Sequence, residues 1–193
     1  MKKYKMPRKD SIILTAIEII DELGIHELST RELANRQGVS EPALYRHFRS
    51  KQDIILAVID HFSKFDSMIV ETIKERKLNS REGIRFFMSS FYEYYENYPA
   101  LTAIIFAYDI LRYDPVIGER IKSILDARYS ALNHVIKNGQ QNGEISKTFI
   151  SEDLSDTILG LGRSITLRWR MTNCGFPLKQ RVMLALESLL AVC

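Results

Sequence analysis

The side chains best suited to sequence-selective binding lie close together in this chain, between residues 29 and 51. Arg46 carries a guanidinium that can donate two hydrogen bonds to a guanine edge, or bind a phosphate. Pro42 and Ala43 offer small apolar surfaces that can press against a thymine methyl group. A guanidinium and small apolar groups at this spacing favour double-stranded DNA as the partner.

A second set of side chains in the same segment carries donors that suit phosphate oxygens, which fix the register of a protein on DNA. These side chains are Tyr45, His47 and Lys51. We also expect Thr30 to cap a helix whose N-terminal amides form a further phosphate site. The alternative for Tyr45 is a core tyrosine, and the alternative for Lys51 is a solvated helix start.

Two short helices joined by a tight turn must position these groups. Ser29 or Thr30 can accept the N-cap hydrogen bond of the first helix, and Ser40 that of the second. Gly38 stands where the first helix must stop, a position that favours a left-handed backbone. Pro42 fits the first turn of the second helix, where no N–H is needed. The apolar positions of the pair are Leu33, Ala34, Val39, Leu44 and Phe48. This pattern predicts a helix-turn-helix.

The segment Ser29–Lys51, with its Tyr45 and His47, resembles the DNA-binding segment of the tetracycline-repressor (TetR) family. The resemblance extends over roughly residues 8–60. It implies a DNA-binding transcriptional regulator and adds Arg31 as a base-reading residue near the start of the first helix. It also implies a larger helical domain that commonly binds an inducer.

Glu41 departs from the family pattern, in which some members carry a neutral amide at this position. Its carboxylate can accept a hydrogen bond from cytosine N4, although its charge repels phosphates. Alternatively, the charge only stabilises the N-terminus of the second helix through the macrodipole. The sequence does not distinguish these two roles of Glu41 and therefore predicts no base preference.

Local charge supports a nucleic-acid partner more than the net charge does, which is only +3. Residues 29–51 contain five basic and two acidic side chains. The first nine residues contain Lys2, Lys3, Lys5, Arg8 and Lys9 and no acid. A basic arm and a basic patch attract phosphates electrostatically. The arm alone would also fit a solubilising tail.

The rest of the chain predicts an all-α fold of about nine helices. Prolines and glycines are few, and no alternating strand pattern occurs. Besides the helix-turn-helix pair, we expect helices over residues 10–23, 51–76, 81–98, 101–113, 115–142, 151–172 and 177–192. Residues 1–60 are expected to form a three-helix DNA-binding domain with a basic arm. Residues 61–193 are expected to form a larger helical domain for ligand binding and dimerisation.

Aromatic residues in the second domain predict either a plain core or an apolar pocket for a small effector. The inducers of the family favour the pocket. The residues expected to line it are Phe87, Phe91, Tyr94, Ile105, Tyr108, Tyr129 and Trp169. The effector should be mostly apolar and aromatic or lipid-like. Its polar group, if acidic, would meet one of the arginines at positions 85, 112, 128 and 163, which helical spacing does not distinguish.

The last two helices, residues 151–172 and 177–192, predict self-association. Both are apolar over more than one stripe, so they need cover beyond their own domain. The stripes comprise Leu154, Ile158, Leu161, Ile165, Val182, Ala185, Leu186 and Leu189. Pairing these helices in a two-fold homodimer gives a four-helix bundle. The alternative is a monomer that buries them completely.

Catalytic and metal-binding patterns do not occur. The four histidines are scattered, and Cys174 and Cys193 form no CxxC pair. The run Gly160-Leu161-Gly162 lacks the third glycine of a dinucleotide fingerprint and favours close helix packing instead. We therefore expect no enzymatic activity, no metal and no cofactor.

Neither a signal peptide nor a membrane span is predicted, so we expect a cytoplasmic protein that does not contact membranes. The leading hypothesis is a homodimeric repressor that a small apolar effector releases from a palindromic operator. One alternative is a DNA-binding architectural or partner-recruiting protein of the same fold without an effector. A more remote alternative is an enzyme without recognisable motifs.

Overall fold

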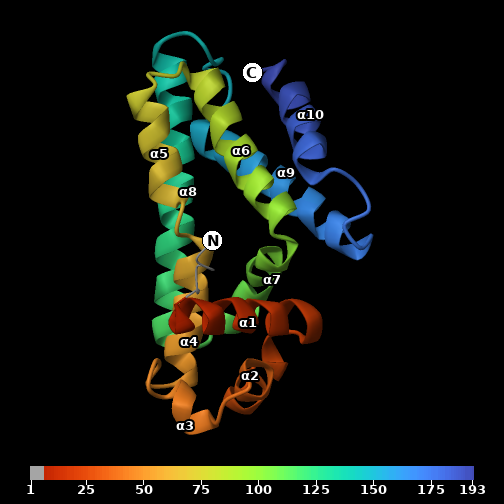
Figure 1. Ribbon diagram of the computed structural model, residues 1–193. Coiled ribbons are helices and arrows are strands. Elements are labelled where there is room, and N and C mark those ends of the chain that lie inside the picture. Colours follow the sequence, from red (N-terminus) through yellow and green to blue (C-terminus); the bar gives the residue numbers. More distant parts are fainter. Residues whose placement is uncertain (1–6) are drawn as a thin grey trace, which may run out of the picture. The chain divides into compact units, whose positions relative to one another are not determined.

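The computed structural model describes residues 7–193, and this part of the chain contains ten α-helices, two short 3₁₀ helices and no β-strand (Figure 1). The α-helices are α1 (Arg8–Leu23), α2 (Thr30–Gln37), α3 (Glu41–Leu44), α4 (Lys51–Phe62), α5 (Asp66–Glu75), α6 (Ser80–Asn97), α7 (Thr102–Leu111), α8 (Pro115–Gln141), α9 (Ser151–Met171) and α10 (Leu178–Leu190). The 3₁₀ helices are Ile25–Glu27 and Pro99–Leu101. The predicted all-α fold is confirmed. Lys2, Lys3 and Lys5 of the predicted basic arm lie outside the described residues.

One helix boundary was predicted wrongly. The sequence predicted a single helix from Lys51 to Arg76, but α4 ends at Phe62 and α5 begins at Asp66. At the break, the hydroxyl of Ser63 donates to the carbonyl oxygen of Ile59 at 3.2 Å. Such a side-chain bond competes with the helical hydrogen bonds of the backbone. This break accounts for the tenth α-helix.

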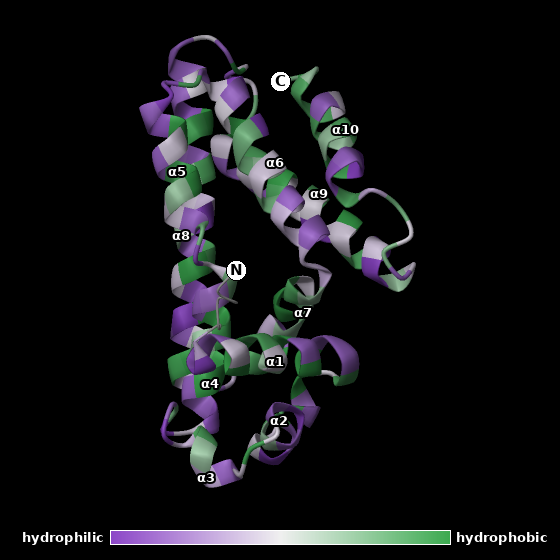
Figure 2. Cartoon of the chain, viewed as in Figure 1, coloured by the Kyte–Doolittle hydropathy of each residue, from purple (hydrophilic) through white to green (hydrophobic). Residues whose placement is uncertain are grey.

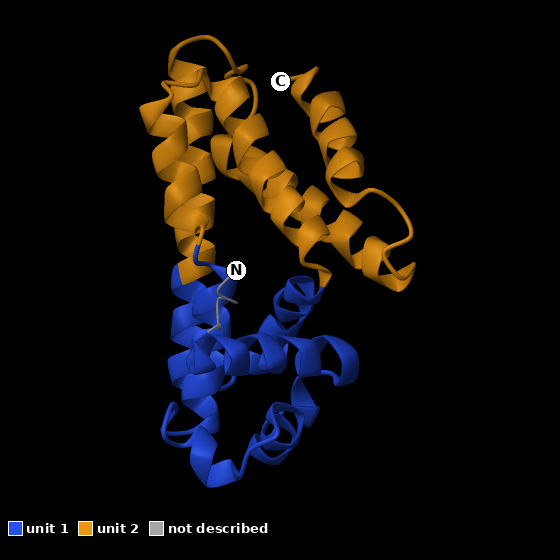
Figure 3. Cartoon of the chain, viewed as in Figure 1, with its two compact units in different colours: residues 1–64, 100–123 blue, residues 65–99, 124–193 orange. Residues whose placement is uncertain are grey.

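The chain divides into two compact units (Figure 3). Unit 1 comprises residues 1–64 and 100–123, and unit 2 comprises residues 65–99 and 124–193. Helix α8 contributes its first part to unit 1 and the remainder to unit 2. The two compact units are discontinuous in sequence, whereas the expected functional domains, residues 1–60 and 61–193, are continuous. The assignment of DNA binding to the first domain and of ligand binding and dimerisation to the second remains a prediction.

Unit 1 is built around α1, which packs against α2, α4 and α7. The inner face of α1 is buried and comprises Ile13, Ala16, Ile17 and Ile20. Helix α7 is hydrophobic along most of its length (Figure 2) and adds Tyr108, whose ring meets the Phe62 ring edge-on at 6.0 Å. At the start of α8, Gln52 donates to both carboxylate oxygens of Asp114, at 3.0 and 2.8 Å.

Unit 2 is built around α6, which packs against α5 and α10. Glycines allow two further helices to approach α6 closely. A methyl group at Gly83 of α6 would meet Val135 of α8, and one at Gly162 of α9 would overlap the hydroxyl of Tyr92. The prediction that glycines of α9 serve close packing is confirmed for Gly162, whereas Gly160 faces open space.

The two glycines of α9 give a matched test of this packing. Gly162→Ala should lower the free energy of unfolding by about 1–3 kcal/mol, because the added methyl group displaces Tyr92. Gly160→Ala should raise it by about 0.5–1 kcal/mol, because alanine is the better helix former and meets nothing there. Urea denaturation followed by circular dichroism measures both. Equal effects of the two substitutions would contradict the close approach of α9 to α6.

Candidate nucleic-acid interface

Residues 29–48 form the predicted helix-turn-helix. The hydroxyl of Ser29 accepts the N–H of Glu32 at 3.1 Å and so caps α2. Gly38 ends α2 in a left-handed conformation, with φ 62° and ψ 37°, and the N–H of Val39 donates back to the Ala34 carbonyl at 3.0 Å. These contacts satisfy both ends of a short helix and confirm the predicted roles of Ser29 and Gly38.

Helix α3 is shorter than the sequence pattern indicated. Its four residues end at Leu44, and the chain continues in a helical turn in which the N–H of Phe48 donates to the Leu44 carbonyl at 3.1 Å. Leu44 and Phe48 are only 1% and 4% exposed, respectively, as predicted. Because these two side chains point inward, the turn between them presents its remaining side chains to solvent.

The predicted DNA-reading residues all reach the surface. Tyr45 is 50% exposed, so it is not a core tyrosine. Helix α3 has proline in its first turn, as predicted, whereas Ser40 occupies the N-cap position without a side-chain capping bond. The exposed members of the set are Arg31, Ser40, Pro42, Tyr45, Arg46, His47 and Lys51, and the half-buried ones are Thr30, Glu41 and Ala43.

Thr30 has a role other than the predicted helix cap. Its hydroxyl donates to Oε2 of Glu41 at 2.6 Å and joins the first residue of α2 to the first residue of α3. Ser29 provides the cap instead. The bond fixes one oxygen of the Glu41 carboxylate and gives Glu41 a structural role besides the two that the sequence left open.

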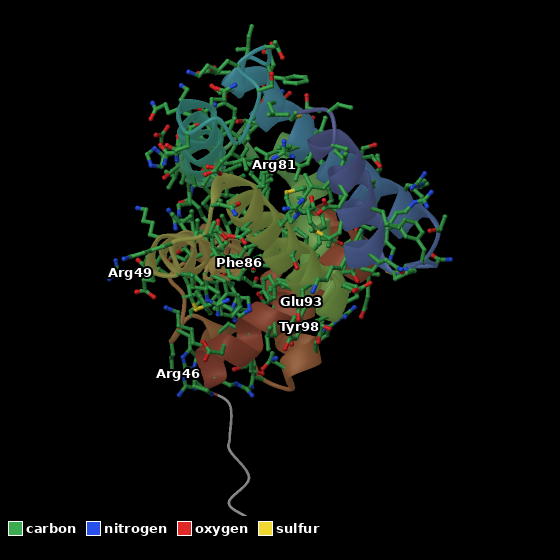
Figure 4. The ribbon with its side chains drawn as sticks, turned by 90° about the horizontal axis from the view of Figure 1, so that it is seen from above. Arg46, Arg49, Arg81, Phe86, Glu93 and Tyr98 are labelled. Atoms are coloured by element: carbon green, nitrogen blue, oxygen red, sulfur yellow. The ribbon has the colours of Figure 1, made fainter. Side chains whose placement is uncertain are left out.

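Arg49 is a candidate phosphate ligand that sequence reasoning missed. Its backbone N–H donates to the Asp53 carboxylate at 2.9 Å, while its side chain is exposed between Arg46 and Lys51 in sequence. Arg46 and Arg49 lie in the segment between α3 and α4, and Figure 4 shows them at the edge of the molecule. The sequence did contain a signal for this role, namely a positive charge directly before Ser50, the N-cap residue of α4. At the same end of the motif, the ammonium of Lys9 in α1 lies 5.4 Å from the ring centroid of Phe48.

Family comparisons agree with this geometry. The family model for the C-terminal region of YsiA-like protein matches residues 57–192. The family model for bacterial regulatory proteins of the tetR family matches residues 12–58, which include the whole helix-turn-helix. The chain belongs to the TetR family. It is therefore a DNA-binding transcriptional regulator, and regulators of the TetR family bind DNA as homodimers.

Among curated relatives, this TetR-family regulator is similar to the fatty acid metabolism regulator protein of Bacillus subtilis (strain 168). The two are 25% identical over 177 residues, which cover 91% of this chain and 90% of the relative. The tetracycline repressor protein class C of Escherichia coli is 40% identical over 53 residues, covering 28% of this chain and 24% of the repressor.

Solved structures show the same fold over nearly the whole chain. The transcriptional regulator FadR of Bacillus subtilis superposes with a TM-score of 0.81 at 23% identity, covering 95% of this chain and 98% of FadR. The ketosteroid regulator KstR2 of Mycobacterium tuberculosis superposes with a TM-score of 0.83 at 17% identity, covering 97% and 95%.

Unit 2 of the regulator contains a groove of about 560 Å³ between α5, the start of α6 and α8. Its apolar lining includes Val70, Ile73 and Phe87, and its polar lining includes Lys74 and His134. Of the seven residues predicted to line an effector pocket, Phe87 borders this groove and the other six do not.

The predicted pocket residues are divided between the two units. Ile105 and Tyr108 belong to unit 1, and Phe87, Phe91, Tyr94, Tyr129 and Trp169 belong to unit 2. Within residues 7–193, the buried Trp169 Nε1 and Tyr94 hydroxyl have no hydrogen-bond partner. Unsatisfied buried donors are uncommon in folded proteins, so these two atoms distinguish this interior from a plain apolar core.

The apolar stripes predicted for dimerisation are partly used within the chain itself. Leu154, Ile158 and Leu186 are at most 3% exposed, so they belong to the core of unit 2. Val182 is equally buried, whereas Leu161, Ile165, Ala185 and Leu189 are half-buried. The large apolar side chains that α9 and α10 expose are Leu167, Met171 and Leu184.

Within the described residues, no group of three or more histidine, cysteine, aspartate or glutamate side chains could hold a metal ion. No helix in that part of the chain is both long and apolar enough to cross a membrane.

Phosphate contacts by the exposed turn can be tested directly. Tyr45→Ala and Lys51→Ala should each weaken DNA binding on the order of five- to tenfold, to a similar degree for all sequences, because they remove contacts to the backbone. Both residues are exposed, so the melting temperature should stay near that of the parent. Fluorescence anisotropy with duplex DNA measures the affinity. Tyr113→Ala, which removes an exposed tyrosine of unit 1 outside the motif, serves as control. Parent-like binding by both variants would show that the reading surface lies elsewhere.

Proposed function

We propose that this TetR-family regulator is a repressor that binds a palindromic operator as a homodimer and leaves it when an amphipathic ligand with a long apolar chain binds unit 2. The DNA-reading face described above carries the first half of the proposal. Two identical heads must fit major grooves about 34–36 Å apart, so a small change in their separation is enough to release the operator.

The apolar ligand is supported by the interior of unit 2 and by related proteins. Helix α6 is rich in aromatic side chains, and the groove beside it is lined by apolar residues, such as Val70 and Ile73, together with Lys74 and Lys77. FadR of Bacillus subtilis was solved in complex with stearoyl-CoA. Thermus thermophilus FadR, which superposes with a TM-score of 0.62, was solved with lauroyl-CoA. An acyl thioester is therefore the first class of effector to test.

The operator and the effector can be identified in two steps. Selection from random duplexes should enrich an inverted repeat whose half-sites lie about one helical turn apart. Stearoyl-CoA should then release the protein from the selected duplex, while CoA alone should not, because the acyl chain supplies the apolar contact. Enrichment of a single half-site would contradict the dimeric repressor. Failure of many apolar ligands to release the operator would favour the effector-free architectural protein.

Dimerisation through α9 and α10 has its own test. Leu184→Glu places a charge on an apolar side chain that is 58% exposed on α10, so it should prevent pairing without disturbing the core. Met68→Glu is the matched control, because Met68 is 53% exposed but lies on α5. Sedimentation velocity at micromolar concentration should give a dimer for the parent and the control and a monomer for Leu184→Glu. A dimeric Leu184→Glu variant would move the interface away from these helices.

A further inference from the structure

A largely buried arginine–carboxylate pair lies in unit 2. Arg128 of α8 donates from Nε to Oδ2 of Asp66 at 2.6 Å and from Nη2 to Oδ1 at 2.9 Å. The two side chains are only 12% and 19% exposed. Both oxygens of the carboxylate are thus held by one planar guanidinium, which is the geometry that arginine uses to bind acidic ligands.

The other arginines named as partners for an acidic group are at the surface. Arg85 pairs with Glu187, with side chains 40% and 45% exposed. Arg112 pairs with Asp109, with side chains 58% and 76% exposed. Arg163 is exposed as well. Arg128 is therefore the member of the four that is placed to meet the polar group of a ligand buried in unit 2.

Aromatic side chains surround the buried pair. The Tyr95 hydroxyl accepts a hydrogen bond from Nη1 of Arg128 at 3.1 Å, and the guanidinium lies 4.6 Å from the ring centroid of Phe91. Phe65, the residue before Asp66, packs edge-on against Tyr94 with ring centroids 5.0 Å apart. A guanidinium in such apolar surroundings needs an anion, because an unpaired buried charge is strongly unfavourable. The chain itself supplies that anion.

Tyr94 provides a donor that the protein does not use. Its hydroxyl is buried, and no hydrogen-bond partner for it occurs within residues 7–193. Burial raises the pKa of Tyr94 to about 12, with a smaller contribution from the nearby charge of Asp66, so the hydroxyl keeps its proton. An incoming acidic group that displaces Asp66 therefore finds an unoccupied donor near the site of that carboxylate.

The position of Asp66 in the chain connects this site to the rest of the fold. Asp66 is the first residue of α5, and no side chain caps that helix. Unit 1 ends at Lys64, two residues earlier, in the break between α4 and α5. The chain therefore enters unit 2 directly before Asp66, and the pair with Arg128 holds this point against α8.

We propose that Arg128 is the receptor for an acidic group of the effector, a carboxylate or a phosphate, and that Asp66 is its internal competitor. The ligand takes the guanidinium, accepts a hydrogen bond from Tyr94, and frees the first turn of α5 from α8. The freed turn carries the change to the chain segment that leads to the DNA-reading helices. The regulatory step rests on the proposed function, whereas binding of the acidic group can be measured without DNA.

Three probes with a carbon chain of the same length differ only in their polar group: stearate, stearoyl-CoA and neutral stearyl alcohol. Each is used below its critical micelle concentration. Binding is followed by intrinsic fluorescence and operator release by anisotropy on the selected duplex. The parent should prefer stearate or stearoyl-CoA over the alcohol, and the preferred probe distinguishes a carboxylate from a phosphate. Asp66→Asn should bind that acidic probe about tenfold more tightly and the probe-free operator more weakly, because the competitor loses its charge.

Arg128→Gln alone would leave Asp66 buried without a partner, so the double variant Asp66→Asn with Arg128→Gln is used to remove the receptor. It should lose the preference for acidic probes while it keeps its helical circular dichroism. Asp60→Asn is the matched control, because it removes one member of an exposed pair, Arg120–Asp60 at 2.7 Å, and should behave as the parent.

Each other outcome has a defined meaning. A parent that binds neither acidic probe, or a double variant that keeps the acidic preference, overturns the inference. If the double variant is also released from the operator like the parent, the proposed repressor function stands and its receptor lies elsewhere. If the acidic preference depends on Arg128 but no protein is released from the operator, the receptor stands and the regulatory step is wrong.

Discussion

The predicted DNA-reading surface depends on one constraint, which is that helix α3 is too short to be stable by itself. Helix α3 has four residues, whereas an isolated helix in water needs about 12–15. Its conformation comes instead from the burial of Leu44 and Phe48 beneath it. The polar contacts of α2 with α1 belong to the same support, since Gln37 donates to the Thr15 hydroxyl at 2.7 Å and Arg36 to Glu22 at 2.7 Å. Core packing, rather than helix propensity, therefore holds the exposed donors in place.

Sequence alone was sufficient to predict most of the helix-turn-helix because the signals that specify it are local. A capping serine, a glycine at a left-handed position and apolar residues at helical spacing each act within one or two turns of the chain. The bond between Thr30 and Glu41 could not be predicted in this way. It joins side chains that are far apart in sequence and depends on how α2 and α3 are placed by the core.

The rest of the chain was less predictable because its important features are tertiary. The break after Phe62 contains neither glycine nor proline, so no sequence signal marks it. Helical spacing assigned Tyr108 to the same interior as Phe87, although Tyr108 packs on Phe62 in unit 1. Four arginines looked equivalent in the sequence, and only the fold shows that Arg128 is withdrawn from solvent. Periodicity gives the face of a helix but not the depth at which a residue lies.

Unit 1 is built from two separate stretches of the chain, which has consequences for its synthesis and for the transfer of its DNA-binding part into chimeric proteins. Translation delivers α1–α4 first, then residues 65–99 of unit 2, and only afterwards α7, which packs on α1. Until α7 leaves the ribosome, part of the apolar surface of α1 has no cover, so unit 1 cannot complete its core during the synthesis of residues 65–99. For the same reason, a chimera joined at residue 60 would separate the head from one of its own helices. A chimera that is to keep unit 1 intact has to include residues 100–123 as well.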